Sequence, residues 1–173
     1  MKCSEIITLL EQEYGKEYAC DWDNVGLLAG RSTKEVKKIL LSLDATDEVV
    51  RMAAEGGYDM LITHHPMLFS AIKRVTDQDM NGRRLLELIR NDISYYAMHT
   101  NYDTRGMADL AARLMGLTEC AVLEEVKDGE GIGRVGKLPH PMTLRECGEQ
   151  VKVAYGIQNV RLFGDPDTQV SLV

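Results

Sequence analysis

The sequence predicts an α/β protein with a mainly parallel sheet and flanking helices. Three short apolar runs alternate along the chain with three amphipathic segments of about ten residues. Runs of this length are typical of buried strands, and the longer segments have the periodicity of helices. Because two parallel strands need a crossover long enough to hold a helix, this alternation indicates parallel βαβ units. We expect strands at 38–43, 59–63 and 93–98 and helices at 47–55, 82–91 and 107–115.

The segments before and after this core are expected to contain further elements. Residues 3–14 have the apolar face of a helix, whereas the polar stretch 21–26 is typical of a loop. No internal repeat, low-complexity tract or linker interrupts the chain. Beyond the core we expect two strands around a glycine-rich turn at 117–138, a helix near 143–155 and strands near 158–163 and 168–173.

We predict a division into two parts at residue 120. Residues 1–120 hold the βαβ units and are interpreted as a first α/β lobe that carries the metal ligands proposed below. Residues 121–173 are interpreted as the start of a second, truncated lobe, because the chain ends on an apolar strand. A sheet edge in a core must be covered or paired, so a domain rarely stops at such a strand.

Composition and charge exclude several classes of protein. The 173 residues carry a formal net charge of -7, with 45% hydrophobic and 27% charged residues, which is the balance of a soluble globular protein. A chain this acidic lacks the broad basic surface that nucleic-acid binding requires. We find no secretory signal and no apolar run long enough to span a membrane, so we expect a cytoplasmic protein. The cysteines are scattered without a CxxC pair, which argues against a disulfide framework or a cysteine-rich zinc site.

Polar side chains follow two of the predicted strands at their carboxyl ends. His64 and His65 come directly after one strand, and His99 and Asp103 follow the next. In open α/β sheets, ligands bind in the crevice outside the carboxyl ends of the strands, so these side chains are expected to face one cleft. Successive side chains leaving a strand point in opposite directions, so adjacent histidines suit two ions better than one. A mixed histidine and carboxylate set favours Zn, Mn, Fe, Co or Ni over Ca or Mg.

The roles of the neighbouring residues are open, because a single histidine is more often structural than a metal ligand. His99 could be a ligand, although a role in orienting Asp103 is favoured. Asp44, at the end of the first core strand, is equally suited to accept a hydrogen bond behind a metal ligand or to cap the helix that follows. His140 lies between two prolines in an expected loop and is assigned no role.

The segment 131–136 reads Gly-Ile-Gly-Arg-Val-Gly and matches the GxGxxG pattern of dinucleotide-binding proteins in its letters alone. In those proteins a helix follows the glycines, but here the next five residues include two prolines, which prevent a helix. We therefore interpret the segment as a glycine-bearing β-turn and strand.

Five motifs occur in an order that is typical of one protein family. They are Trp22-Asp23-Asn24-Val25-Gly26-Leu27, Asp44-Ala45-Thr46, Leu61-Ile62-Thr63-His64-His65-Pro66, His99-Thr100-Asn101-Tyr102-Asp103 and Gly131-Ile132-Gly133-Arg134-Val135-Gly136. Together they resemble the Nif-three-like family, whose members are often labelled GTP cyclohydrolase 1 type 2 homologs. The resemblance covers essentially the whole chain. It implies an α/β fold of two similar lobes, a toroidal homohexamer and two divalent metal ions per subunit.

The resemblance also implies roles for the site residues. His64 would bind one metal ion, and His65 and Asp103 would bind the other. The family completes its site with a histidine and a glutamate from a HxxxE-type segment near the C-terminus, and this sequence has no such segment. We therefore expect the second lobe and the metal site to be incomplete.

The implied function is divalent-metal binding with hydrolase activity on a nucleotide-like or phosphorylated small molecule. GTP ring opening is one candidate reaction. A non-catalytic metal-trafficking or regulatory protein would have the same ligands, and turnover of a nucleotide substrate would distinguish the two. A third alternative, an interaction module, would hold no stoichiometric metal.

Overall fold

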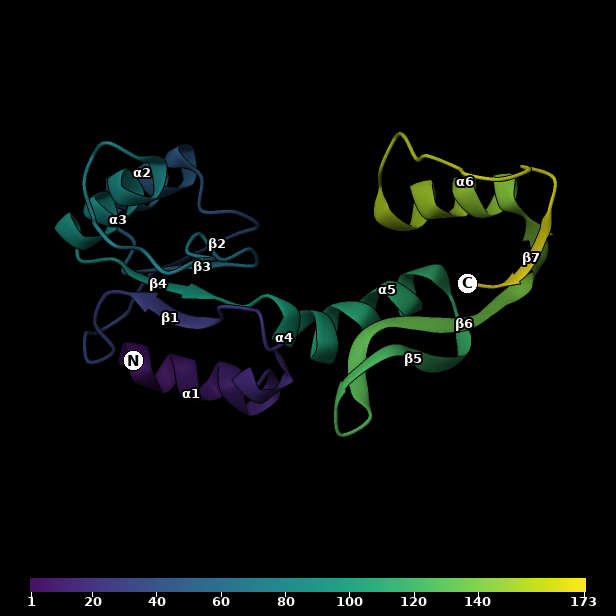
Figure 1. Ribbon diagram of the computed structural model, residues 1–173, viewed down its shortest axis with the longest axis horizontal. Coiled ribbons are helices and arrows are strands. Elements are labelled where there is room, and N and C mark those ends of the chain that lie inside the picture. Colours follow the sequence, from purple (N-terminus) through teal and green to yellow (C-terminus); the bar gives the residue numbers. More distant parts are fainter. The chain divides into compact units, whose positions relative to one another are not determined.

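The computed structural model describes residues 1–173, which divide into two compact units, Met1–Tyr102 and Asp103–Val173 (Figure 1). The first unit contains a four-stranded sheet and the second a three-stranded sheet. The division predicted at residue 120 falls later in the chain, inside strand β5 (Thr118–Lys127) of the second unit. None of the helices has the length and apolar character needed to cross a membrane.

The sheet of the first unit is mainly parallel, as predicted. Strand β3 (Met60–Thr63) pairs in parallel with β2 (Ile39–Ser42) on one side and with β4 (Ser94–Ala97) on the other. Strand β1 (Gly26–Ala29) pairs antiparallel with β4, which gives the order β1-β4-β3-β2. We did not predict β1, because its four residues directly continue a polar loop.

Helices cover both faces of this sheet. Helix α1 (Cys3–Glu13) lies on one face, and α2 (Asp47–Glu55) and α3 (Met80–Arg90) lie on the other, as Figure 1 shows. The predicted helices of the first unit are therefore all present, and α2 and α3 form the crossovers that the parallel pairs β2–β3 and β3–β4 require.

Strand β3 is buried on both faces, in two separate apolar cores. Leu61 packs with Val50 of α2 and Leu88 of α3. Its neighbours Met60 and Ile62 belong to the core on the side of α1. A strand buried on both faces has a continuous apolar sequence instead of an alternating one, which is why the run could be recognised.

Capping residues determine where α2 and α3 begin. The Thr46 hydroxyl accepts a hydrogen bond from the backbone N–H of Val49, and α2 begins at the predicted residue. The Asp79 carboxylate accepts the backbone N–H of Gly82 at 2.8 Å. This cap extends α3 two residues upstream of its predicted start at residue 82.

The second unit combines an antiparallel sheet of order β5-β6-β7 with two helices and a π-helical turn. Its small core consists of Met115, Leu138, Met142 and Cys147. Strands β5 and β6 form the predicted pair around a glycine-rich turn. In chain order, the remaining elements of this unit are the π-helical turn η2 (Asp103–Met107), α5 (Ala108–Met115), β6 (Glu130–Thr143), α6 (Leu144–Tyr155) and β7 (Gln169–Leu172). The first unit also contains two short helical turns, η1 (Lys16–Tyr18) and α4 (Thr100–Tyr102).

Two expectations for the second unit were wrong. Residues 158–163 form no strand, because the extended segment passes over α6 with Leu162 against Gly148 and has no strand beside it. His140 lies within strand β6 and not in a loop. The two prolines beside it are accommodated by an irregular register between β6 and β7, where Lys137 and Met142 mark the ends of the interruption.

Asp59 joins the start of β2 to β3 and is expected to make stability depend on pH. Its Oδ2 accepts the backbone N–H groups of Lys37 at 2.8 Å and Lys38 at 3.0 Å. The Lys37 hydrogen bond is the main reason that the pKa of Asp59 lies below 3.8, although burial opposes it. The stabilisation by the carboxylate is therefore present above the unfolded-state pKa and is lost as the pH falls through the folded-state pKa.

Asp59→Asn is thus expected to lower the free energy of unfolding by about 1 kcal/mol at pH 7. The difference from the natural chain should shrink to nothing as the pH falls below 3.8. Urea unfolding at a series of pH values measures it, with exposed Asp21 changed to Asn as the control. A difference that stays constant down to the lowest pH would contradict this role.

Candidate metal centre

Three histidines converge at the carboxyl ends of β3 and β4. One ring nitrogen each of His64, His65 and His99 lies within 4.8 Å of the corresponding nitrogens of the other two. The ring centroids of His64 and His65 are 4.9 Å apart, and His99 lies 5.2 Å from His64 and 5.6 Å from His65. The expectation that these strand ends meet is therefore confirmed for the three histidines.

The parallel ladder places these residues. Beyond the end of β3, the backbone N–H of His65 donates to the carbonyl of Leu43 at 2.9 Å. The hydrogen bonding between the β2 and β3 segments therefore extends past both strands as far as His65. The backbone N–H of Met98 donates to the carbonyl of Thr63 at 2.9 Å and extends the pairing of β4 with β3. His99 is the next residue, so its position follows from the same register.

Each imidazole has its Nδ1 atom engaged by an oxygen of the protein. For His64 the partner is the carbonyl of Met98 at 2.9 Å, and for His65 it is Asp44 Oδ1 at 2.7 Å. For His99 it is Asp23 Oδ1 at 2.9 Å. An oxygen acceptor at Nδ1 selects the tautomer with a proton on that nitrogen, which assigns Nε2 as the candidate ligand atom.

Asp23 is the site residue that the sequence reasoning missed. Its side chain has 0% exposure and lies in the loop before β1. Burial raises the pKa of Asp23, but hydrogen bonds from the hydroxyl of Thr100, from His99 and from backbone N–H groups outweigh it and hold the pKa below its usual value. Asp23 is 76 residues from His99 in the sequence, so only its place in a recurring motif could have drawn attention to it.

Asp44 lies behind His65, and the cap of α2 belongs to another residue. The N-cap is Thr46, as described above, while Asp44 Oδ1 contacts His65 Nδ1. The side chains of His65 and Asp44 are 48% and 51% exposed. Of the two roles left open for Asp44, the geometry thus favours that of an acceptor behind a histidine.

Tyr95 of β4 is fully buried and holds the turn that contains the two adjacent histidines. The Tyr95 hydroxyl accepts the backbone N–H of Met67 at 2.7 Å and lies 2.9 Å from Thr63 Oγ1. Thr63 Oγ1 in turn donates to the carbonyl of His65 at 2.8 Å. Burial is the main cause that raises the pKa of Tyr95, so the hydroxyl keeps its proton.

Tyr95→Phe is expected to destabilise the first unit by about 1–3 kcal/mol, because it leaves the N–H of Met67 without its partner. Tyr58→Phe is the matched control, since no hydrogen bond of its hydroxyl stabilises the fold, and should change stability by less than about 0.5 kcal/mol. Urea unfolding measures both variants. Equal stabilities for the two variants would show that Tyr95 does not hold the turn.

The remaining candidate residues lie in the second unit. Asp103 is the first residue of the π-helical turn η2 and is partly exposed. Its role as a carboxylate ligand stays a prediction. His140 is exposed on β6.

The three histidines fit a transition-metal ion by their chemistry. Neutral imidazoles are ligands for Zn, Fe, Co, Ni and Cu, and metal-binding histidines characteristically donate their second N–H to a carbonyl or carboxylate. Two nitrogens on one ion lie at most about 4.2 Å apart, given metal–nitrogen distances of about 2.1 Å. The ring nitrogens of the three histidines lie within 4.8 Å of one another, which is close to this value. Small ring rotations would therefore bring them to the distances that coordination of one ion requires.

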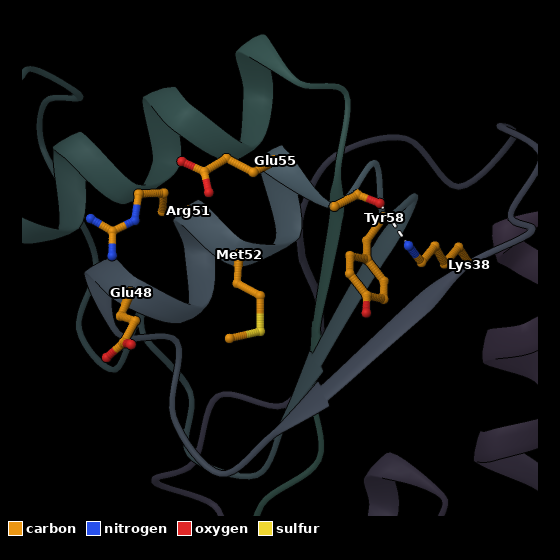
Figure 2. Close-up of a pocket in the computed structure, with 7 residues that line it drawn as sticks. Lys38, Glu48, Arg51, Met52, Glu55 and Tyr58 are labelled. Carbon is orange, nitrogen blue, oxygen red and sulfur yellow. Dashed lines mark hydrogen bonds between the residues drawn. The ribbon is translucent and has the colours of Figure 1, made fainter.

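A surface hollow over α2 is a different feature from this histidine group (Figure 2). Lys38 donates to the carbonyl of Gly56 at 2.7 Å and lies 4.2 Å from the ring centre of Tyr58, so its charge is already engaged. The hollow contains no histidine and has balanced charges. Its lining side chains are Lys38, Glu48, Arg51, Met52, Glu55 and Tyr58.

The fold and the site define an α/β protein with a histidine group at the carboxyl ends of parallel strands. The family model described as Duf34/NIF3 (NGG1p interacting factor 3) matches residues 1–173. The chain belongs to this family, and the resemblance found in the sequence is confirmed.

Curated relatives are identical to this chain at about a third of the aligned residues. A GTP cyclohydrolase 1 type 2 homolog of Clostridium perfringens is 37% identical over 169 residues, which cover 95% of this chain and 64% of the relative. A Streptomyces coelicolor protein of the same description is 34% identical over 180 residues, covering 99% and 63%. The chain therefore spans less than two thirds of the length of these relatives.

Solved structures show the same fold. A Staphylococcus aureus protein of 27% identity matches with a TM-score of 0.88 over 99% of this chain and 70% of its own. Reduced HcgD from Methanocaldococcus jannaschii, at 35% identity, matches with a TM-score of 0.79 over 88% and 60%. A Bacillus cereus protein related to NIF3 reaches a TM-score of 0.92 over 99% and 75%, and at 23% identity it supports the fold alone.

Proposed function

We propose that this chain binds divalent transition-metal ions through His64, His65 and Asp103, with Asp44 and His99 as orienting residues. The observation that carries the proposal is the convergence of three imidazoles whose Nδ1 atoms are each held by a protein oxygen. Metal-binding histidines characteristically have their second ring nitrogen held by a carbonyl or carboxylate in this way. Its donor set suits Zn, Mn, Fe, Co or Ni.

The grouping adds a second role for His99 beside the orienting one. Its ring lies as close to His64 as a third ligand would. Buried Asp23 fixes the tautomer of His99 in the same way that Asp44 fixes that of His65. Loss of metal affinity in His99→Ala as large as in His64→Ala would identify it as a ligand, and a smaller loss as an orienting residue.

The activity that we propose for the full-length form is hydrolysis of a nucleotide-like or phosphorylated small molecule. A bound divalent ion would supply Lewis acidity and a means of activating water. The protein's own contribution is to hold the imidazole tautomers through Met98, Asp44 and Asp23. The relatives' description as GTP cyclohydrolase 1 type 2 homologs supports a nucleotide as the substrate class. We further expect a homohexamer in the cytoplasm.

One observation favours a second function, metal storage or delivery without catalysis. About half of the His65 side chain and of its partner Asp44 is exposed. An open site of this kind allows an ion to exchange with solvent or with a partner protein. Small-molecule turnover distinguishes the two functions.

The first test of the proposal is a measurement of the metal bound by the protein. The 173-residue chain and a version extended to carry the histidine and glutamate of the family's HxxxE-type segment are dialysed against Zn²⁺ or Co²⁺ and then analysed for bound metal. We expect the short chain to hold up to one ion weakly and the extended one to hold two. Metal-loaded and chelator-treated protein are then compared on nucleotides and sugar phosphates. No bound metal in either form would refute the metal centre, whereas binding without turnover would support metal storage or delivery.

A further inference from the structure

Arg134 occupies an unusual place in the glycine-bearing segment 131–136 of strand β6. Its side chain is only 7% exposed, although it carries a full positive charge. A buried guanidinium is costly unless every donor is satisfied. The partners of Arg134 therefore show what the protein uses this charge for.

All five N–H donors of the guanidinium have an oxygen within reach. Nη1 donates to the carbonyls of Gly131 at 2.8 Å and Gly133 at 2.9 Å, within the same strand. Nε donates to Asp109 Oδ1 at 2.7 Å on α5. Nη2 donates to the carbonyl of Thr104 at 3.4 Å and lies 3.5 Å from Glu130 Oε2.

The glycines of the segment make this arrangement possible. Gly133 has a φ of +74°, a left-handed conformation that side chains disfavour. A Cβ at Gly131 would lie 1.9 Å from the carbonyl oxygen of Glu124, so any larger residue would push β6 away from β5. The two glycines thus bring their own carbonyls to the guanidinium. The segment therefore matches GxGxxG because Gly131 and Gly133 are needed for the strand pairing and for the contacts with Arg134, and not because it binds a nucleotide.

The Thr104 carbonyl belongs to the π-helical turn η2, whose first residue is Asp103. Thr104 has 0% exposure, and its hydroxyl has no hydrogen-bond partner, so no hydrogen bond of this side chain holds the turn. Asp109 lies on the helix α5 that directly continues the turn. One guanidinium therefore joins strand β6 to both the turn and the helix after it.

We propose that Arg134 is the positioning residue for Asp103. By holding the Thr104 carbonyl and Asp109 at once, it fixes the wide π-helical turn and with it the direction in which the Asp103 carboxylate leaves the backbone. The inference rests on the proposed metal-binding role of Asp103. Lysine cannot replace arginine here, because one ammonium group cannot reach acceptors on three sides of a planar fork.

Hydrogen exchange on the metal-free chain tests the positioning without reference to metal. In Arg134→Lys, the backbone amides of residues 104–107 should exchange at least about tenfold faster than in the natural chain, because the turn opens locally. Gln150→Ala is the matched control, since it removes a hydrogen bond to the Met115 carbonyl elsewhere in the same unit. Equal acceleration in both variants would reduce Arg134 to a general stabilising residue and overturn the proposal.

A double-mutant cycle then tests the connection to Asp103. With Co²⁺ as the probe, Arg134→Lys should weaken binding about tenfold or more and change the visible absorption of the bound ion. In the Asp103→Ala background, the same substitution should have no further effect. A full additional loss in that background would overturn the proposal. Absence of Co²⁺ binding by the natural chain would refute the metal centre instead, and the exchange data would still decide whether Arg134 holds the turn.

Discussion

Replacing His65 with alanine is expected to lower the affinity of the chain for Zn²⁺ or Co²⁺ by at least about 100-fold. Loss of a residue that merely supports a ligand costs about 10–100-fold, so loss of a ligand should lie at or beyond the upper end of that range. His65 is also the residue that connects Asp44 to the site, through a hydrogen bond of 2.7 Å. Its removal leaves that carboxylate without its histidine.

The chain offers a matched control for this experiment in His140, the only histidine outside the group of three. His140→Ala removes the same side chain from an exposed position on β6 and should leave metal binding unchanged. Both variants are titrated with Co²⁺ and followed by visible absorption, with thermal unfolding to verify the fold. An equal loss in both would mean that binding is adventitious, and no loss in His65→Ala would place the site elsewhere.

Leu88→Ala is expected to destabilise the first unit by about 2–5 kcal/mol, the largest effect on stability that we predict. Leu88 has 0% exposure on α3 and packs in the core that contains Leu61 of β3. Truncation removes its apolar contacts and leaves a cavity that the surrounding sheet and helices cannot fully close. Because β3 leads directly into His64 and His65, the metal site should weaken together with the fold.

The next residue on the helix provides the comparison. Ile89 is 57% exposed, so Ile89→Ala should cost less than about 1 kcal/mol. Urea unfolding measures both, and hydrogen exchange at Tyr95 and Tyr96 of β4 assigns the loss to the first unit. Similar costs for the two substitutions would show that α3 does not pack on the sheet as described.

The sequence alone was sufficient for the features that depend on local patterns. The runs of β3 and β4 are continuous because these strands lie inside the sheet and are fully buried, and a parallel arrangement follows from the spacing between the strands. The run of β2 was wrongly expected to be buried, because β2 is an edge strand and Leu41 is 71% exposed. The parallel arrangement aligns the carboxyl ends of the strands, so the meeting of His64, His65 and His99 could be predicted. The start of α2 at Asp47 was predicted from the helical periodicity, whereas its cap is Thr46 and not Asp44, the residue considered for that role.

The tertiary structure alone decided which partners these residues have. Asp23 reaches His99 across 76 residues of sequence, and Arg134 reaches the carbonyl of Thr104 across 30. Neither contact leaves a periodic pattern, because each is made by one side chain from a loop or a bulged strand. The segment 158–163 shows the converse, since its sequence resembles a strand but no neighbouring strand offers it hydrogen bonds. Extended backbone becomes a strand only when a partner satisfies its N–H and C=O groups, and the position of a partner is a property of the folded chain.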